Sequence, residues 1–363
     1  MTRYLLAGGG TAGHVNPLLA VADRIALREP NAVILVLGTV EGLESRLVPA
    51  RGYELLVVGR LPFPRRVNAA ALHFPVRFTR LIRQIRGLIR ERSIDVVVGF
   101  GGYVSAPAYI AARLEKVAIA IHEANARPGM ANRLGACLTR FVGTAFRSAR
   151  LPHARYVGMP LRHEIEMLDR PAERRDALRF FGLSPSRPTL LITGGSQGAK
   201  QINDTVNAAA ATIIGAGWQI LHVTGERSEL APTTLAHYLR VGYCDRMELA
   251  LAAADLAISR AGAATVSEFS ALGVPAVYVP LSIGNGEQRH NARDVVSAGG
   301  ALIVDNAEFT PRWILDRLVP LLDDRALIAG MAARTLAVGV LDGADRMVDL
   351  VGDALPPTGG LPT

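Results

Sequence analysis

The sequence predicts an α/β protein made of two Rossmann-like domains whose parallel sheets face each other across a cleft. Short, continuously apolar runs alternate with longer helical patterns along the chain, as in strands that helices cover on both faces. At residues 8–14 and 194–199 a glycine-rich turn follows such a strand and opens a helix. The 363-residue length exceeds a comfortable single core and favours two domains.

Two series of apolar, β-branched runs are expected to form the strands. Because helical patterns separate them, the strands should form right-handed βαβ units and hence parallel sheets. The first series comprises residues 3–7, 33–37, 54–58, 95–99, 117–121, 141–144 and 155–157. The second comprises residues 189–193, 219–223, 238–241, 255–258, 276–279 and 301–304.

The domain boundary is expected just after Gly158. We predict a first domain over residues 1–158 and a second over residues 159–341. The C-terminal helical pattern, roughly 323–355, is punctuated by Gly339 and Gly343, and its last part, about 342–355, is expected to pack back onto the first domain. Residues 356–363, which are mostly Pro, Gly and Thr, should form a flexible tail.

Cysteine usage and hydropathy fit a protein of the reducing cytoplasm. Cys137 and Cys244 form no CxxC pair, so neither a disulfide framework nor a zinc site is expected. The chain enters a predicted strand at once, so we expect no signal peptide. Its apolar runs stay short of the ~20 residues that a membrane span needs.

Positive charge is concentrated between residues 60 and 92, where nine arginines face one acid, Glu91, within a chain of net charge +8. Residues 74–92 there predict a basic amphipathic helix. Together with residues 61–64 (Leu-Pro-Phe-Pro), it suits an anionic membrane surface, at about 1 kcal/mol per basic residue. Equally, its apolar stripe could face the domain core; a nucleic-acid partner is not expected, because lysines and aromatics are not interleaved. The apolar stripe is Phe78, Leu81, Ile82, Ile85, Leu88 and Ile89, and the basic one is Arg80, Arg83, Arg86 and Arg90.

The first glycine-rich turn, residues 8–14, formally matches the dinucleotide pattern G-x-G-x-x-G. Such a site also needs an acid at the end of the second strand, but that strand ends Leu-Gly-Thr and Glu41 comes late. NAD binding is therefore disfavoured. His14 would lie at a helix N-terminus facing the cleft, where the dipole favours the neutral, basic ring. The alternative is a histidine that only caps a surface helix.

Two polar groups in the second half follow predicted strands. In residues 259–268, Thr265 can cap a helix, and Glu268, one turn further, can accept hydrogen bonds from a sugar diol. An ordinary helix start explains the same residues. In residues 284–292, Gln288 and Asn291 suit sugar hydroxyls, although a solvated helix start would look alike. Residues 101–105 and 122–125 likewise follow strands of the first domain.

Together these segments resemble the MurG family, bacterial transferases that add N-acetylglucosamine (GlcNAc) to undecaprenyl-linked muramyl-pentapeptide and so convert lipid I to lipid II. The resemblance covers almost the whole chain. It implies a GT-B fold, an inverting reaction, and neither a required metal nor a cofactor. The motifs are GGGTAGHVNP (8–17), GFGGYVSAP (99–107), HEAN (122–125), GMPLR (158–162), GGSQGA (194–199), SRAGAATVSE (259–268) and EQRHNA (287–292).

The resemblance also implies roles for individual residues. The pyrophosphate would be held by Ser196 and by the helix start of Ala263, Ala264 and Thr265. Glu268 would hold the ribose, Cys244 lies where the family's backbone contacts uracil, and Gln288 and Asn291 would read GlcNAc hydroxyls. Thr11, Ala12, Gly13, His14 and Asn125 would close over the transferred sugar, and Arg162 is a further ligand residue.

The implied chemistry is attack of the C4 hydroxyl of the muramyl sugar on the anomeric carbon while UDP leaves. His14 is the candidate general base, with Glu123 or a water as the fallback. Backbone N–H groups and helix dipoles would stabilise the leaving pyrophosphate. The chain departs from the family at Ala12, Ala124 and Met159, where other members carry Gly, Gln and Asn. Ala12 is tolerable only if its φ is negative.

The expected partners are UDP-GlcNAc, lipid I and an anionic membrane surface, which places the protein at the cytoplasmic side of the cell membrane as a peripheral protein. Other proteins of cell-wall synthesis remain open as partners. Two other functions stay open as well. One is a related GT-B enzyme acting on another lipid such as diacylglycerol, and the other is an inactive nucleotide-sugar-binding protein.

Overall fold

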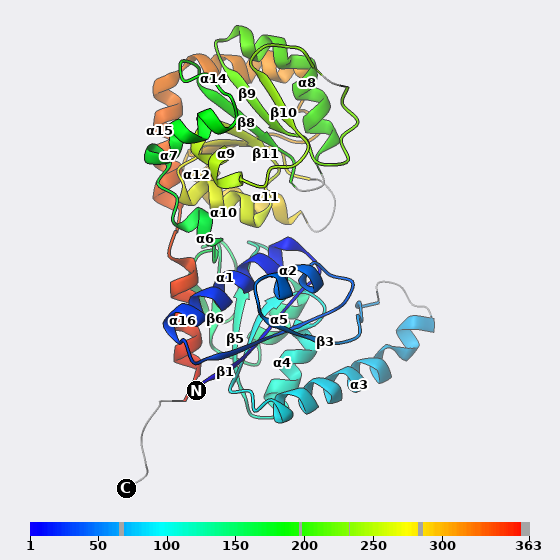
Figure 1. The fold of residues 1–363 in the computed structure, drawn as a ribbon. Helices are drawn as coiled ribbons and strands as arrows, with labels where there is room; N and C mark the ends of the chain where they lie inside the picture. The colour runs from blue at the N-terminus through cyan, green and yellow to red at the C-terminus, as the bar shows by residue number, and fades with distance from the viewer. Residues whose placement is uncertain (65–68, 196–197, 232, 282–285, 357–363) are drawn as a thin grey trace. The chain divides into compact units, whose positions relative to one another are not determined.

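The computed structural model of the chain divides into two compact units (Figure 1). Unit 1 combines Met1–Arg162 with Leu341–Thr363, and unit 2 is His163–Val340. Each unit is built on one parallel sheet, which confirms the predicted α/β class. The expected tail, residues 356–363, lies outside the described residues except for Pro356. The structure describes residues 1–64, 69–195, 198–231, 233–281 and 286–356.

Unit 1 contains a seven-stranded sheet in the order β3-β2-β1-β4-β5-β6-β7. The strand order reverses between β1 and β4, and ligands of open α/β sheets bind at the carboxyl ends of the strands beside such a reversal. The strands are β1 (Arg3–Gly8), β2 (Val33–Gly38), β3 (Glu54–Val57), β4 (Val96–Gly101), β5 (Ala118–Glu123), β6 (Val142–Thr144) and β7 (Ala154–Tyr156). The helices are α1 (Ala12–Arg28), α2 (Glu44–Ala50), α3 (Ala69–Glu91), α4 (Ser105–Leu114), α5 (Met130–Ala136) and α16 (Gly343–Ala354).

Both faces of the unit 1 sheet are covered, which explains why its strands are apolar without alternation. Leu6 of β1 belongs to the core that the sheet forms with α1 and α16. Its neighbour Leu5 belongs to the core on the other face, formed with α3, α4 and α5.

The C-terminal helix α16 packs on α1 as part of unit 1. Met347 and Val351 of α16 are buried in the core that includes Leu6. At the surface, Arg28 of α1 forms an ion pair of 2.6 Å with Asp349. The amphipathic sequence of α16 therefore supplies one wall of the first core.

Unit 2 contains a six-stranded parallel sheet in the order β10-β9-β8-β11-β12-β13, whose order reverses between β8 and β11. The strands are β8 (Thr189–Thr193), β9 (Gln219–Val223), β10 (Tyr238–Val241), β11 (Leu256–Ser259), β12 (Ala276–Tyr278) and β13 (Ala301–Ile303). The helices are α6 (His163–Glu166), α7 (Arg170–Phe180), α8 (Lys200–Gly215), α9 (Met247–Ala253), α10 (Ala263–Ala271), α11 (Glu287–Asn291), α12 (Arg293–Ser297), α13 (Pro311–Trp313), a π-helical turn (Ile314–Leu318), α14 (Val319–Asp323) and α15 (Arg325–Val338).

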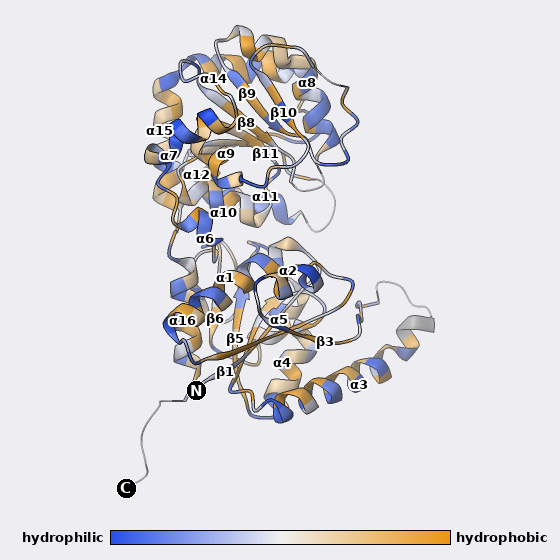
Figure 2. Cartoon of the chain, in the orientation of Figure 1, coloured by the Kyte–Doolittle hydropathy of each residue, from blue (hydrophilic) through white to orange (hydrophobic). Residues whose placement is uncertain are grey.

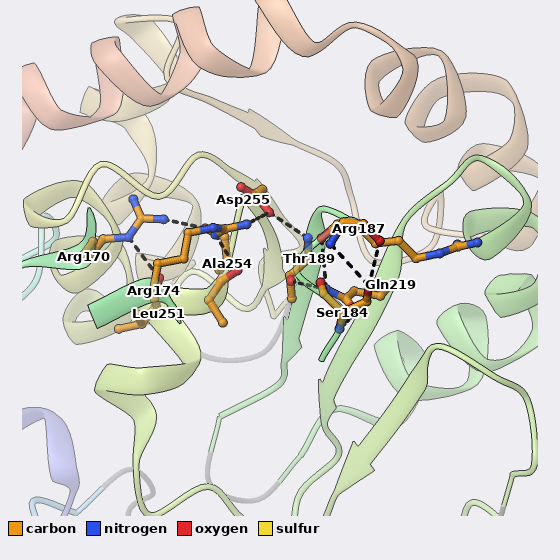
Figure 3. A network of polar contacts seen from close by, with 11 residues as sticks. Arg170, Arg174, Ser184, Arg187, Thr189, Gln219, Leu251, Ala254 and Asp255 are labelled. Atoms are coloured by element: carbon orange, nitrogen blue, oxygen red, sulfur yellow. Dashed lines mark hydrogen bonds and ion pairs between the residues drawn. The ribbon is translucent and has the colours of Figure 1, made fainter. Parts of the chain in front are cut away.

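A partly buried polar network joins the amino ends of the unit 2 strands (Figure 3). The side-chain amide of Gln219 accepts from the Ser184 N–H at 2.8 Å and donates to the carbonyl of Ser184 at 2.8 Å. Asp255 accepts from the Thr189 N–H at 2.7 Å and pairs with Arg174 of α7 at 2.8 Å. This edge is opposite the glycine-rich loops, so the network supports the sheet rather than a ligand site.

One segment of the described residues, Arg325–Ala354, is long and apolar enough by composition to cross a membrane. It consists of α15 and α16, and the helix is interrupted between Val338 and Gly343. The apolar face of α16 is buried in unit 1, which accounts for the hydropathy of that half without a membrane.

Candidate active site

The first glycine-rich loop connects β1 to α1 at the carboxyl edge of the unit 1 sheet. Thr11 is the N-cap of α1 with φ −126°, and its side chain makes no capping hydrogen bond. Ala12 is the first residue of the helix and is not among the described residues with positive φ. Ala12 therefore avoids the positive φ that its Cβ would disfavour. Gly10 adopts the left-handed conformation instead, with φ +89°.

His14 is held by the same loop. Its Nδ1 lies 3.1 Å from the carbonyl oxygen of Gly9 and 3.4 Å from Oγ1 of Thr11. A carbonyl can only accept, so the neutral ring carries its proton on Nδ1 and leaves the Nε2 lone pair unprotonated. A Cβ built on Gly101, the last residue of β4, would lie 3.1 Å from that Nε2. The ring edge with the basic nitrogen thus lies beside the end of β4.

Glu123 ends β5 and is 3% exposed. Its Oε1 accepts from the Asn125 N–H at 2.8 Å, and its Oε2 accepts from the Gly129 N–H at 3.0 Å and from Nδ2 of Asn132 at 2.9 Å. Tyr109 donates in turn to Oδ1 of Asn132 at 2.7 Å. Both carboxylate oxygens are therefore engaged in shaping the loop that carries Asn125.

These residues line one cavity of about 620 Å³ in unit 1. Thr11, His14, Glu123 and Asn125 are brought together there, although they come from two loops far apart in the sequence. The cavity also has an aromatic side, where Phe74 of α3 stacks on Phe78 with ring centroids 5.3 Å apart and meets Phe63 at 5.3 Å. It combines polar groups and an apolar wall in one space.

Glu44, at the start of α2, is 1% exposed and is not among the residues predicted from the sequence. Its Oε2 accepts from the Gly10 N–H at 2.8 Å, and its Oε1 accepts from the N–H and hydroxyl of Thr39 at 3.0 and 2.9 Å. Burial acts to raise the pKa of Glu44, but hydrogen bonds led by the Gly10 and Thr39 N–H groups outweigh it and hold the pKa below its usual range. Glycines 9, 38 and 42 leave space for Glu44, because a Cβ at each would meet its side chain, but this relation is visible only in the fold.

In unit 2, α10 begins at Ala263, directly after β11 and its short loop. The prediction that Thr265 caps this helix is wrong: Gly262 is the N-cap, no side chain caps it, and Thr265 is already the third helical residue. The small residues of this loop let the helix begin at Ala263, before Thr265. Because N–H groups of a first helical turn lack intrahelical partners, those of Ala263, Ala264 and Thr265 suit an anion.

The loop before α10 is held from two sides. Arg260, which sequence analysis did not single out, donates to the carbonyl of Val279 at 2.9 Å and to Oδ1 of Asn306 at 2.6 Å. Burial lowers the pKa of Arg260. Asn291 is 1% exposed and donates to the carbonyl of Ala261 at 3.3 Å. An arginine directly after a buried strand was the available signal.

The remaining candidates of unit 2 are Glu268, Cys244, Gln288 and Ser196. Glu268 is half-buried on α10, and Cys244 is half-buried between β10 and α9. Oε1 of Gln288 accepts from the Leu281 N–H at 2.9 Å, which fixes the side chain of α11 against the loop after β12. Ser196 lies outside the described residues.

Three candidates belong to unit 1 but do not line its cavity. Gly13 and Ala12 lie in the first turn of α1, beside the cavity-lining Thr11 and His14. Arg162 is the last residue of the first segment of unit 1.

The chain matches known protein families over both units. Residues 4–142 match the N-terminal domain of glycosyltransferase family 28, and residues 189–347 match its C-terminal domain. Over 351 residues, 97% of this chain and 98% of the relative, it is 64% identical to the "UDP-N-acetylglucosamine--N-acetylmuramyl-(pentapeptide) pyrophosphoryl-undecaprenol N-acetylglucosamine transferase" of Leifsonia xyli subsp. xyli. The protein of the same name from Streptomyces coelicolor is 46% identical over 357 residues, 97% of this chain and 98% of the relative.

A solved structure agrees with these sequence matches. The crystal structure of Acinetobacter baumannii MurG superposes with a TM-score of 0.79 at 28% identity and covers 97% of this chain and 100% of its own. The fold and the two domain matches define a glycosyltransferase of family 28. Within that class, the chain belongs to the MurG family.

Proposed function

We propose that this chain transfers GlcNAc from UDP-GlcNAc to the C4 hydroxyl of undecaprenyl-pyrophosphoryl-MurNAc-pentapeptide, with inversion at the anomeric carbon. The product of this step is lipid II, made from lipid I. Near-full-length identity of 64% to a relative named for this reaction supports the substrate pair. The single structural observation that carries the proposal is the unit 1 cavity, where a basic imidazole and an aromatic wall share one space.

Catalysis needs a base for the attacking hydroxyl, and His14 suits this role. Its Nδ1 is bound to the Gly9 carbonyl, so Nε2 is the nitrogen that takes the proton. The hydroxyl oxygen then bonds to the anomeric carbon as the bond from that carbon to the UDP oxygen breaks, and the electron pair leaves with UDP. Glu123 is the fallback base. Because both its oxygens already accept hydrogen bonds, it is better suited to positioning Asn125.

The donor is assigned to unit 2, with help from unit 1. The N–H groups of Ala263, Ala264 and Thr265, which lack intrahelical partners, would hold the pyrophosphate and so stabilise the charge of the leaving group. Glu268 would bind the ribose diol, the Cys244 backbone the uracil, and Ser196 the pyrophosphate. Gln288 would donate its amide N–H to a GlcNAc hydroxyl, because its oxygen is bound to Leu281. The proposed donor-binding residues of unit 1 are Thr11, Ala12, Gly13, Asn125 and Arg162.

Asn291 is a different case from Gln288. It is 1% exposed and bound to the carbonyl of Ala261, so little of it can reach a sugar. We place it as support for the loop before α10, with any contribution to GlcNAc recognition made through that loop.

The acceptor is assigned to the unit 1 cavity. Its polar side, with His14 and Asn125, suits a sugar and its pyrophosphate, whereas Phe63, Phe74 and Phe78 suit the hydrocarbon chain. Such a cavity brings a lipid-linked sugar to the base while the lipid stays among apolar side chains.

The outer end of α3 is the proposed membrane contact. Within the predicted apolar stripe, Leu81, Ile85 and Ile89 are buried in the core, which favours the core interpretation for that stripe. The membrane contact is proposed instead for Leu72 and Val76, which lie outside the stripe and are 79% and 64% exposed. Figure 2 shows hydrophobic and hydrophilic residues side by side along α3. Phe63, 58% exposed, extends the apolar end. With the basic residues nearby, this end suits the anionic cytoplasmic leaflet.

The reaction is tested with purified protein, UDP-GlcNAc and a lipid I analogue, with product identified by mass. UDP-glucose and a diacylglycerol acceptor serve as controls, and a parallel sample contains EDTA. We expect lipid II analogue only from UDP-GlcNAc with lipid I, unaffected by EDTA. Product from diacylglycerol alone would contradict the proposal.

The membrane contact is tested by flotation with vesicles of phosphatidylglycerol and of phosphatidylcholine. Leu72→Ser should weaken binding to the anionic vesicles. The matched control is Leu27→Ser on α1, which is 68% exposed on another surface and should bind like the unaltered protein. Equal binding by both variants would remove α3 from the contact.

A further inference from the structure

One peptide group lies between a buried carboxylate and the ring of His14. The carbonyl oxygen of Gly9 is 3.1 Å from Nδ1 of His14, and the N–H of Gly10 is 2.8 Å from Oε2 of Glu44. This carbonyl and this N–H belong to the same planar peptide unit, so they cannot turn independently. Glu44, one peptide and His14 therefore form a continuous hydrogen-bonded chain.

The carboxylate end of this chain is fixed and charged. Glu44 is 1% exposed, and its other oxygen accepts both hydrogen bonds from Thr39. A Cβ on Gly38 would lie 2.5 Å from Cγ of Glu44, and Cβ atoms on Gly9 or Gly42 would overlap its carboxylate. Three glycines thus leave space for the side chain of one glutamate. An acid that only stabilised the start of its own helix would not need this space.

The peptide is also confined on its carbonyl side. A Cβ on Gly102, whose φ is +86°, would lie 2.7 Å from the Gly9 oxygen. The loop after β4 therefore packs closely on the Gly9 carbonyl, while Glu44 accepts the hydrogen bond from the N–H at the opposite edge of the same planar peptide. Together they leave the carbonyl one direction, toward His14.

We propose that Glu44 is a positioning residue for the transfer reaction, acting through the Gly9–Gly10 peptide to hold His14 in the tautomer and orientation of a base. This inference rests on the proposed role of His14 as the base. An anion on the N–H side polarises the peptide, because hydrogen bonds in a chain strengthen one another. The Gly9 oxygen becomes a better acceptor for Nδ1–H and stabilises the imidazolium as Nε2 takes the proton.

The arrangement compares with a catalytic triad, in which a carboxylate contacts the histidine directly. Here a backbone peptide lies between the two groups. The carboxylate, which lies 34 residues after Gly10 in the sequence, can therefore remain buried without occupying the space beside the substrate.

The first test is the tautomer of His14, measured by ¹⁵N NMR of the full chain labelled at histidine and assigned with His14→Ala. In the unaltered protein we expect the proton on Nδ1. In Glu44→Gln, the side-chain oxygen can stay with Thr39 while the NH₂ group faces the Gly10 N–H, so we expect a mixture of tautomers. Nε2–H in the unaltered protein, or an unchanged spectrum in folded Glu44→Gln, would overturn the inference. The measurement on the unaltered protein decides even if the variant does not fold.

The second test is kinetic. Glu44→Gln should lower kcat about 10- to 100-fold, by analogy with the loss when the partner that orients a metal-ligating histidine is removed, with UDP affinity unchanged. In a His14→Ala background the same substitution should cause no further loss. The matched control is Glu41→Gln, which removes the same charge from an exposed position three residues earlier and should keep full activity.

The outcomes separate the two proposals. Equal losses from Glu44→Gln with and without His14 would show that Glu44 acts independently, and the relay would be overturned. Full activity of His14→Ala would reject His14 as the base, whereas the NMR result would still decide whether Glu44 positions the ring. Loss of UDP affinity rather than kcat would assign Glu44 to loop structure alone.

Discussion

His222 and Tyr238 are joined by a hydrogen bond of 2.8 Å between the Nδ1 atom of the imidazole and the phenolic hydroxyl, and their rings stack with centroids 6.0 Å apart. The other ring nitrogen lies 3.0 Å from Oδ1 of Asn203. A neutral ring protonated on Nε2 satisfies both contacts. Burial, assisted by the charge of Arg240, lowers the pKa of His222 to about 3.

We expect the free energy of unfolding to fall as the pH drops below about 6.5, the ordinary histidine pKa that the unfolded chain retains. The folded protein leaves His222 neutral down to a pKa of about 3, so unfolding takes up a proton between these values. Stability is fully present above the unfolded pKa and is lost by up to about 1.4 kcal/mol per pH unit below it. His122 adds to this slope, because burial lowers its pKa to about 4.

Urea denaturation over this pH range measures the slope. His222→Gln should flatten it, whatever its effect on stability at neutral pH. The exposed His163 provides the control, since His163→Gln should leave the slope unchanged. Parallel pH profiles for the unaltered protein and His222→Gln would show that His222 does not carry the dependence.

His14→Ala should lower kcat by roughly two to four orders of magnitude. UDP affinity should stay nearly intact, because base catalysis acts only in the transition state and unit 2 is assigned most of the UDP contacts. Steady-state kinetics together with UDP titration separate the two effects. A variant with normal kcat, or with its entire loss in UDP binding, would place the base elsewhere.

Glu268→Ala should weaken UDP-GlcNAc binding by about 1–3 kcal/mol, because the ribose diol would lose a charge-assisted partner. Calorimetry on the free protein gives this value without a lipid acceptor. The exposed Glu308 supplies a control of the same charge, Glu308→Ala. Unchanged affinity in Glu268→Ala would remove Glu268 from the donor site.

Gln288→Ala should mainly reduce the preference for UDP-GlcNAc over its C4 epimer. Its oxygen is fixed by the Leu281 N–H, which aims a single amide N–H₂ group at hydroxyls rather than at phosphate. The ratio of kcat/KM values for the two donors is the quantity to measure. If that ratio is the same in both proteins, Gln288 does not read the sugar.

The strands were predictable because a strand buried on both faces is apolar throughout, as at Leu5 and Leu6. The C-terminal helix was harder to predict. The sequence predicts one helical pattern over residues 323–355, punctuated by Gly339 and Gly343, whereas the structure has two helices, α15 and α16. The close approach of Gly339 to the Ser270 carbonyl, which ends α15, is a tertiary contact without a local signal.

The candidate site divides in the same way. His14 and Glu123 could be found because each follows a buried strand at the carboxyl edge of the sheet. Glu44 could not, since an acid in the first turn of a short helix has an ordinary local explanation. Only the fold brings it to Gly10. The prediction that Thr265 caps α10 was wrong for the opposite reason. Threonine is a favoured capping residue, but the small residues before it let the helix begin earlier.

The packing of α16 against α1 has a consequence for biosynthesis. Unit 2 is one continuous stretch, His163–Val340, and can fold as soon as it leaves the ribosome. The first segment of unit 1 precedes unit 2 in the sequence, yet one wall of its core is supplied by Met347 and Val351, which are translated after unit 2. During synthesis the first segment of unit 1 therefore exposes the apolar surface of α1 until α16 has been made. The part of the polypeptide made first is the part that completes its fold last.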